Sequence, residues 1–139
     1  MTDTRADYAA LLLRLSLGAM FVAHALLKVF VFTVPGTVQF FQSLGLPGVL
    51  AYVTIAAELI GGAMLILGVR TRWVALALVP IMLGATWVHI GNGWLFSAPK
   101  GGCEYPLFWM ITLFVQALLG DGAYALRFGG ARLARLQAA

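Results

Sequence analysis

The chain has 139 residues, of which 62% are hydrophobic and only 10% are charged. A soluble domain carries about 25% charged residues, so this composition excludes an ordinary soluble protein and predicts one embedded in a lipid bilayer. The net charge of +4 comes from basic residues that flank apolar segments and form no basic face, which argues against a nucleic-acid partner.

Four apolar segments follow one another, each near the length of a membrane span, about 20 residues. They cover about residues 8–32, 48–68, 73–90 and 105–120, and the last is the shortest. Only helices and closed barrels satisfy their backbone in lipid, and the segments lack the alternation of barrel strands. The expected fold class is all-α: an integral membrane four-helix bundle that forms a single domain over residues 1–139.

The connecting segments add three expectations. The N-terminus lacks the short apolar core and cleavage site of a signal peptide, so the first helix should remain in the mature protein. Residues 35–47 hold apolar side chains that suit a short interfacial helix or an ordinary loop; these are Val38, Phe40, Phe41 and Leu44. Residues 125–139 are expected to form a basic cytoplasmic tail.

Basic residues are distributed unevenly between the two sides of the bundle. One side holds only Lys28 and Lys100. The N-terminal region, the second connection and the tail hold seven basic residues: Arg5, Arg14, Arg70, Arg72, Arg127, Arg132 and Arg135. Because Lys and Arg favour cytoplasmic loops, both termini are expected in the cytoplasm.

A weak internal repeat is also visible. Residues 17–24 read Leu-Gly-Ala-Met-Phe-Val-Ala-His, and residues 83–89 read Leu-Gly-Ala-Thr-Trp-Val-His, one residue shorter. This pattern suggests a duplicated helical hairpin with its axis along the membrane normal, although apolar sequences also match by chance.

Ionisable residues inside apolar segments are costly in lipid, so they are functional candidates by default. Arg14, His24 and Lys28 fall within one narrow arc of the first helix. Glu58 lies in the middle of the second helix beside a pair of glycines, which let another helix approach closely. Its depth allows it to pair either toward Arg14 or toward His24 and Lys28.

The ends of the third and fourth helices supply further polar groups. The predicted outward-facing pocket consists of His24, Lys28, Glu58, His89, Asn92, Glu104 and Tyr105. Such a pocket suits a small polar or aromatic molecule. The alternative is a structural ion network, including Arg14 and Glu58, that locks the helices together.

Other residues allow further interpretations. His24 and His89 on facing helices are compatible with a haem, although nothing else in the sequence supports it, and no metal site is expected. Cys103 is the only cysteine, so it cannot form an intramolecular disulfide and is expected to be a free thiol. The tryptophans are expected to anchor the protein at the membrane interfaces, and Trp87 and Trp109 are alternatively pocket residues.

Several motifs between about residues 10 and 125 resemble the DoxX family. The first helix carries Leu13-Arg14-Leu15, Gly18, Phe21, His24 and Lys28, and the first loop carries Phe40-Phe41 and Leu44–Pro47. The later motifs are Glu58–Gly62, Leu67-Gly68, Thr71-Arg72, His89, Asn92-Gly93 and Gly102–Pro106. Cys103 stands where the family pattern has a bulkier residue, which counts against a general role for this thiol.

The resemblance implies a small, multi-pass, four-helix protein of the bacterial inner membrane. The family is associated with a subunit of a thiosulfate:quinone oxidoreductase and with thiol-detoxification partners. The leading functional hypothesis is therefore a subunit of a membrane oxidoreductase system, with a quinone or a small sulfur or aromatic compound in the pocket. The sequence contains no electron carrier, so turnover requires a bound cofactor or a soluble or membrane redox partner subunit.

Two alternatives stay open at this point. Ionisable groups near mid-membrane and an internal repeat also suit a small-solute transporter or permease. The basic tail suits a membrane scaffold that anchors soluble redox partners. The sequence assigns no catalytic residue and leaves open whether the chain forms a homo-oligomer.

Overall fold

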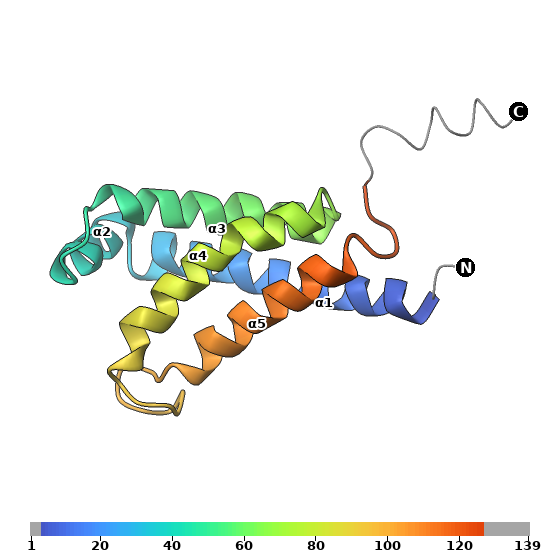
Figure 1. The fold of residues 1–139 in the computed structure, drawn as a ribbon. Coiled ribbons are helices and arrows are strands. Elements are labelled where there is room, and N and C mark those ends of the chain that lie inside the picture. The colour runs from blue at the N-terminus through green and yellow to red at the C-terminus, as the bar shows by residue number, and fades with distance from the viewer. Residues whose placement is uncertain (1–3, 127–139) are drawn as a thin grey trace, which may run out of the picture.

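The computed structural model describes residues 4–126, and this part of the chain is helical with no β-strand. The helices are α1 (Thr4–Leu26), its π-helical continuation η1 (Leu27–Val31), α2 (Val34–Ser43), α3 (Val49–Leu67), α4 (Thr71–Ile90) and α5 (Glu104–Leu119) (Figure 1). The all-α prediction is confirmed. Most of the predicted basic tail, residues 127–139, lies outside the described residues.

Three helical stretches are long and apolar enough to cross a membrane. These are Thr4–Val31, Val49–Leu67 and Thr71–Ile90, with 28, 19 and 20 residues. Helix α5 is also apolar but has only 16 residues, fewer than a span usually needs. Large apolar side chains cover the outside of the bundle, as at Phe30 and Leu118, which are 76% and 85% exposed. Water would not tolerate so much exposed apolar surface, whereas acyl chains solvate it.

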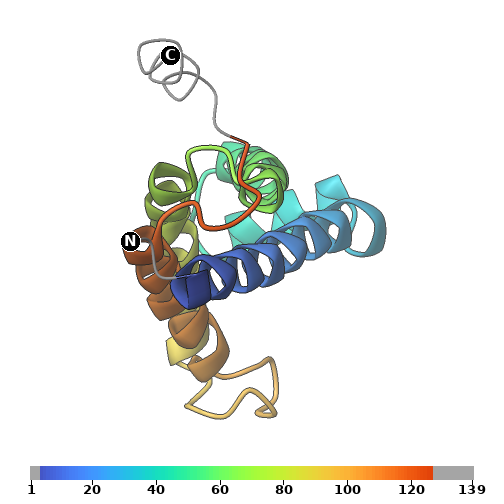
Figure 2. The same ribbon diagram turned by 90° about the vertical axis from the view of Figure 1, so that its right-hand side faces the viewer.

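The helices pack as two antiparallel pairs. Helix α1 packs mainly on α3, and α4 packs mainly on α5, which is the pairing that a duplicated hairpin would give. The pairs lie close together at the end that holds Arg14 and diverge toward the end that holds Lys28 (Figure 1). Figure 2 shows the bundle along its length, with the loop between α4 and α5 projecting below it. We call the two ends the Arg14 end and the Lys28 end.

Two neighbouring glycines of α3 serve two different helix contacts. A Cβ atom on Gly62 would lie 2.9 Å from the carbonyl oxygen of Gly18 in α1, and one on Gly18 would lie 2.7 Å from that of Gly62. A Cβ atom on Gly61 would instead meet the side chain of Leu78 in α4. The absence of side chains thus lets α3 approach α1 at backbone distance, as small residues do between membrane helices.

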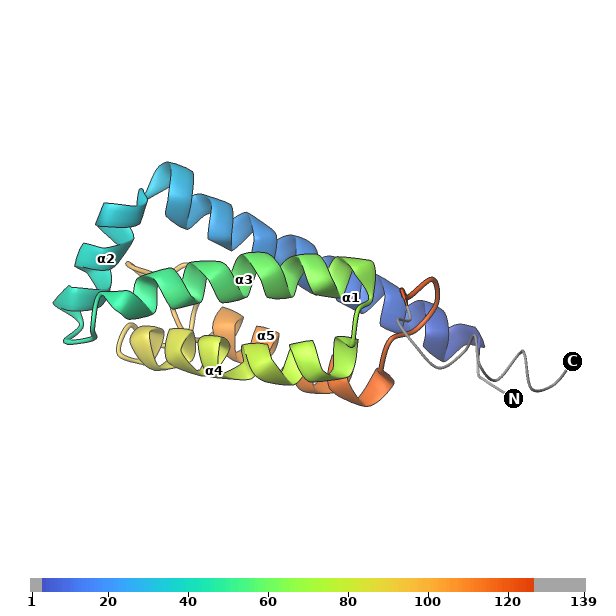
Figure 3. The same ribbon diagram turned by 90° about the horizontal axis from the view of Figure 1, so that it is seen from above.

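Helix α2 connects α1 with α3 at the Lys28 end (Figure 3). It begins at a Thr33 N-cap, whose side-chain oxygen accepts a hydrogen bond from the Gly36 backbone at 3.2 Å, and Pro35 occupies its first turn. Both features favour a helix start. Of the two interpretations of residues 35–47, the short helix is therefore confirmed.

The buried core lies between the four long helices. It includes Leu17, Phe21, Leu65, Val74, Leu78, Met82, Trp109 and Leu113. Because this core fills the centre of the bundle, the polar residues of the site must lie between helices or at the two ends.

Candidate functional site

The first element of the site is an ion pair between Lys28 of η1 and Glu58 of α3. The Lys28 Nζ atom lies 2.9 Å from Oε1 and 2.8 Å from Oε2 of Glu58. The side chains are only 18% and 6% exposed, respectively. Burial of a charge costs free energy unless an opposite charge lies beside it, so each of the two residues offsets the cost of burying the other.

The π-helical turn at the end of α1 contributes to the position of Lys28. In η1 the backbone closes i→i+5 bonds, for example from the Phe32 N–H to the Leu27 oxygen at 2.9 Å. This one-residue insertion changes which of the side chains after Lys28 face the bundle. The Lys28 carbonyl accepts a hydrogen bond from the buried hydroxyl of Thr37 in α2, at 3.0 Å. Helix α2 therefore holds the same turn that carries the lysine.

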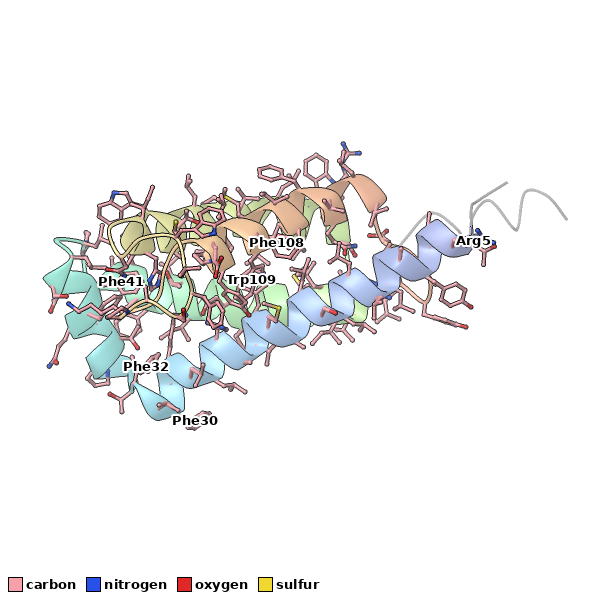
Figure 4. The ribbon with its side chains drawn as sticks, turned by 90° about the horizontal axis from the view of Figure 1, so that it is seen from below. Arg5, Phe30, Phe32, Phe41, Phe108 and Trp109 are labelled. Atoms are coloured by element: carbon pink, nitrogen blue, oxygen red, sulfur yellow. The ribbon has the colours of Figure 1, made fainter. Side chains whose placement is uncertain are left out.

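The second element is an aromatic group that joins α1 to α5. The ring of Trp109 lies 5.0 Å from His24, 4.6 Å from Phe21 and 5.8 Å from Tyr105, measured between centroids. Trp109 is buried, His24 is half-buried and Tyr105 is 47% exposed. Figure 4 shows Trp109 between the two helices. The imidazole ring of His24 makes no hydrogen bond within residues 4–126.

The third element is the loop between α4 and α5, which His89, Asn92 and Glu104 hold together. The Asn92 side-chain amide donates to the Gly101 oxygen at 2.9 Å, and His89 Nδ1 lies 3.2 Å from the same oxygen. The Glu104 carboxylate accepts a hydrogen bond from the Phe96 backbone at 2.8 Å. These residues shape the loop through its own backbone.

The predicted pocket residues thus form three groups, and within the described chain no hydrogen bond or ion pair joins one group to another. Lys28 and Glu58 form one group, and His24 and Tyr105 meet through Trp109. Two apolar grooves, of about 380 and 450 Å³, lie on the surface. The smaller has Tyr105 and Glu104 in its wall. That all seven residues share one chamber remains a prediction.

Arg14 is fully buried, with 1% exposure, and it does not pair with Glu58. Its guanidinium donates to carbonyl oxygens of Leu65, Ile66, Asp121 and Ala123, at 3.1, 2.5, 3.0 and 2.7 Å. The ion network predicted for Arg14 and Glu58 is therefore replaced by two separate anchors. The physical reason is that the guanidinium fork matches the free carbonyls at the end of α3, while Lys28 lies nearer to the carboxylate.

The backbone of α3 explains why these carbonyls need a donor. The helix ends at Gly68, which has φ +72°, with Gly68 and Val69 amides bonded to the Leu65 and Met64 oxygens. This motif leaves the Ile66 oxygen without a backbone partner. Arg14 supplies one, and the negative end of the helix dipole favours its charge.

Asp121 is a residue that the sequence analysis did not single out. Its side-chain oxygen accepts a hydrogen bond from the Thr71 N–H at the start of α4, at 2.9 Å, and its main-chain oxygen binds Arg14. It thereby connects the segment after α5 with both α4 and α1. The Gly120-Asp121-Gly122 turn was the available signal, because Asp and Gly together mark a structured turn.

No three His, Cys, Asp or Glu side chains gather as metal ligands would within residues 4–126. Cys103 is buried at the start of α5. His24 and His89 belong to different groups, one against an indole ring and one in the loop. The polar groups of the site that are available to a ligand are thus the Lys28–Glu58 pair and the His24 imidazole, whose nitrogens make no hydrogen bond within residues 4–126.

Apolar spanning helices and buried ionic anchors define an all-helical membrane protein. The DoxX family model matches residues 9–90, more than half of the chain, and the chain belongs to the DoxX family. A curated relative from Bacillus subtilis (strain 168), "Putative oxidoreductase CatD", is 36% identical over 120 residues, which cover 86% of this chain and 85% of the relative. No solved structure matches the chain.

Proposed function

We propose that the protein is a membrane subunit of an oxidoreductase system and that it binds a quinone or a small sulfur or aromatic compound near Lys28. The observation that carries this proposal is the buried Lys28–Glu58 pair. An ammonium group has three donors, and Glu58 is the only partner of the Lys28 Nζ atom within residues 4–126. The lysine can therefore still donate to a ligand oxygen.

His24 lies four residues before Lys28 and so faces the same side of the helix. Its free ring nitrogens offer a second donor or acceptor for a carbonyl or anionic oxygen. Glu58 balances the charge of Lys28 within the apolar bundle. The name of the Bacillus relative, an oxidoreductase, supports a redox context for such a site. Because the chain has one cysteine and no pair of thiols, electrons must pass through a bound cofactor or a partner subunit.

We further propose that the protein crosses the inner membrane four times with both termini in the cytoplasm. Described segments near both ends of the chain meet at the Arg14 end, where the Ala123 amide donates to the Asp7 oxygen at 3.0 Å. Arg70 lies at the N-cap of α4 and Arg72 in its first turn, at the same end. Positive charge on that side favours the cytoplasm. Helix α5, with 16 residues, spans if the bilayer thins beside it.

Binding of duroquinone to the detergent-solubilised protein, measured by calorimetry, tests the site. The double variant Lys28→Met/Glu58→Gln removes the ammonium without leaving a buried, unpaired carboxylate. A hydrogen bond from a charged donor is worth about 1.5–3 kcal/mol, so its dissociation constant should rise about 10- to 100-fold.

Lys100→Met is the matched control, because Lys100 is an exposed loop lysine and its loss should leave binding unchanged. Duroquinone is a suitable probe because its fully substituted ring resists addition of the Cys103 thiol. If the double variant keeps its fold and binds duroquinone as the wild type does, Lys28 is no ligand group and the proposal fails.

A further inference from the structure

Trp109 carries a buried polar atom that the bundle itself does not satisfy. The residue is 3% exposed, and its indole Nε1–H has no hydrogen-bond partner within residues 4–126. Buried donors are almost always paired, because an unpaired one loses its bond to water without replacement. An orphaned indole N–H in the middle of a site is therefore a candidate ligand contact.

The side chains around this indole leave its donor free. Phe21 offers only carbon, and neither His24 nor Tyr105 is hydrogen-bonded to it, although their rings lie 5.0 and 5.8 Å away between centroids. An imidazole and a phenol thus adjoin the indole without using their polar atoms on it. This places an unsatisfied polar group in an otherwise apolar aromatic contact, between α1 and α5.

Tyr105 links the buried Trp109 ring to the surface through their ring contact. It is 47% exposed, and it also forms part of the wall of the groove of about 380 Å³ beside α5. The other walls of this groove are Trp94, Phe96, Glu104, Leu107, Phe108 and Ile111. The volume accommodates one substituted aromatic ring, and side-chain rotation of a half-exposed tyrosine is fast. Tyr105 is thus shared by the groove and by the aromatic contact with Trp109.

We propose that Trp109 Nε1–H donates a hydrogen bond to an acceptor oxygen of an aromatic ligand that enters from this groove past Tyr105. This inference rests on the proposed function and adds a preference of the site among aromatic ligands. An indole N–H donates and cannot accept, so the site prefers a quinone or phenolate oxygen and rejects a hydrocarbon of the same shape. His24 lies beside that oxygen, and Lys28 lies one helical turn farther along α1.

The test compares duroquinone with durene, which has the same ring and methyl groups but no oxygen. In detergent-solubilised protein with ¹⁵N-labelled tryptophan, Trp109→Phe identifies the Trp109 indole resonance by its absence. Duroquinone should shift this resonance in the wild type, and durene should not. In calorimetry, Trp109→Phe should weaken duroquinone binding roughly 5- to 10-fold, the effect of one lost hydrogen bond. It should leave durene binding unchanged.

Trp73→Phe is the matched control, because Trp73 is 68% exposed at the Arg14 end and should not affect binding. If duroquinone does not shift the Trp109 indole resonance of the wild type, the indole N–H does not bind the quinone. That result overturns the inference without need of a variant. If Trp109→Phe binds normally while Lys28→Met/Glu58→Gln does not, this inference fails and the proposed function stands. If the wild type does not bind duroquinone at all, both fall.

Discussion

Removal of the Arg14 side chain gives the strongest prediction for stability. Arg14→Met keeps the length and apolar stem of the side chain but deletes every donor of the guanidinium. Carbonyl oxygens of Leu65, Ile66, Asp121 and Ala123 then lose that donor. These four belong to the end of α3 and to the segment after α5, so the substitution removes the hydrogen bonds of the Arg14 side chain to both.

The size of the effect follows from the number of bonds. Hydrogen bonds between membrane helices are worth about 0.6–1.7 kcal/mol each, so four bonds contribute about 2–7 kcal/mol. Part of this is offset because the variant no longer buries a charge in the protein interior. We expect a net loss of about 2–4 kcal/mol in the free energy of unfolding. Arg14→Lys should lose less, because a lysine keeps the charge and three donors but not the planar fork.

The assay is unfolding in mixed detergent micelles by titration with SDS, followed by circular dichroism. Arg72→Met serves as the control, because Arg72 is an exposed residue in the first turn of α4 near the same end. Within residues 4–126 its guanidinium makes no hydrogen bond or ion pair, and it lies 6.0 Å from the centroid of the Trp73 ring. Such an exposed contact contributes about 0.5–1 kcal/mol. An Arg14→Met protein as stable as Arg72→Met would refute the view that this arginine holds the bundle together.

Two further predictions concern helix contact and loop order. Gly18→Ala should lower the free energy of unfolding by about 1–3 kcal/mol, because the new Cβ meets the Gly62 backbone, which cannot move aside. The control is Gly84→Ala, which has open space around it and should be neutral or slightly stabilising in the same titration. Asn92→Ala removes the amide donor to the Gly101 oxygen. Amide hydrogen exchange of residues 93–101 should therefore become faster, while exchange in the long helices stays constant. Unchanged exchange in residues 93–101 would show that the backbone alone orders the loop.

The positions of the long helices followed from the sequence alone. Each apolar segment begins or ends at a charged, glycine or proline-rich stretch, and lipid admits only helices there. For residues 35–47 the sequence favours neither a helix nor a loop, because a helix of 10 residues gives a weaker apolar signal than a membrane span. The Thr33 cap and Pro35, which decide it in favour of the helix, become informative only when the end of α1 is known.

The partners of the polar residues did not follow from the sequence in the same way. Helical periodicity placed Arg14, His24 and Lys28 on one side of α1, but Glu58 was left with a choice of two cations. The structure selects Lys28, whose Nζ atom lies 2.8 Å from Glu58, whereas Arg14 is bound to carbonyl oxygens at the end of α3. The sequence predicts Trp109 at a membrane interface or in a pocket. Only the structure shows that it packs against α1 and that its indole N–H has no hydrogen-bond partner within residues 4–126.

By itself, the sequence determined that this is a helical membrane protein, where its helices lie, and that Arg14 and Glu58 are buried among them. These properties depend on the balance of apolar and polar groups along one segment, which any single helix already expresses. The tertiary structure decided which groups meet. Hydrogen bonds and ion pairs form over about 3 Å, and such distances depend on the rotation, crossing and register of separate helices, here set by the Gly18–Gly62 contact and the turn at Lys28.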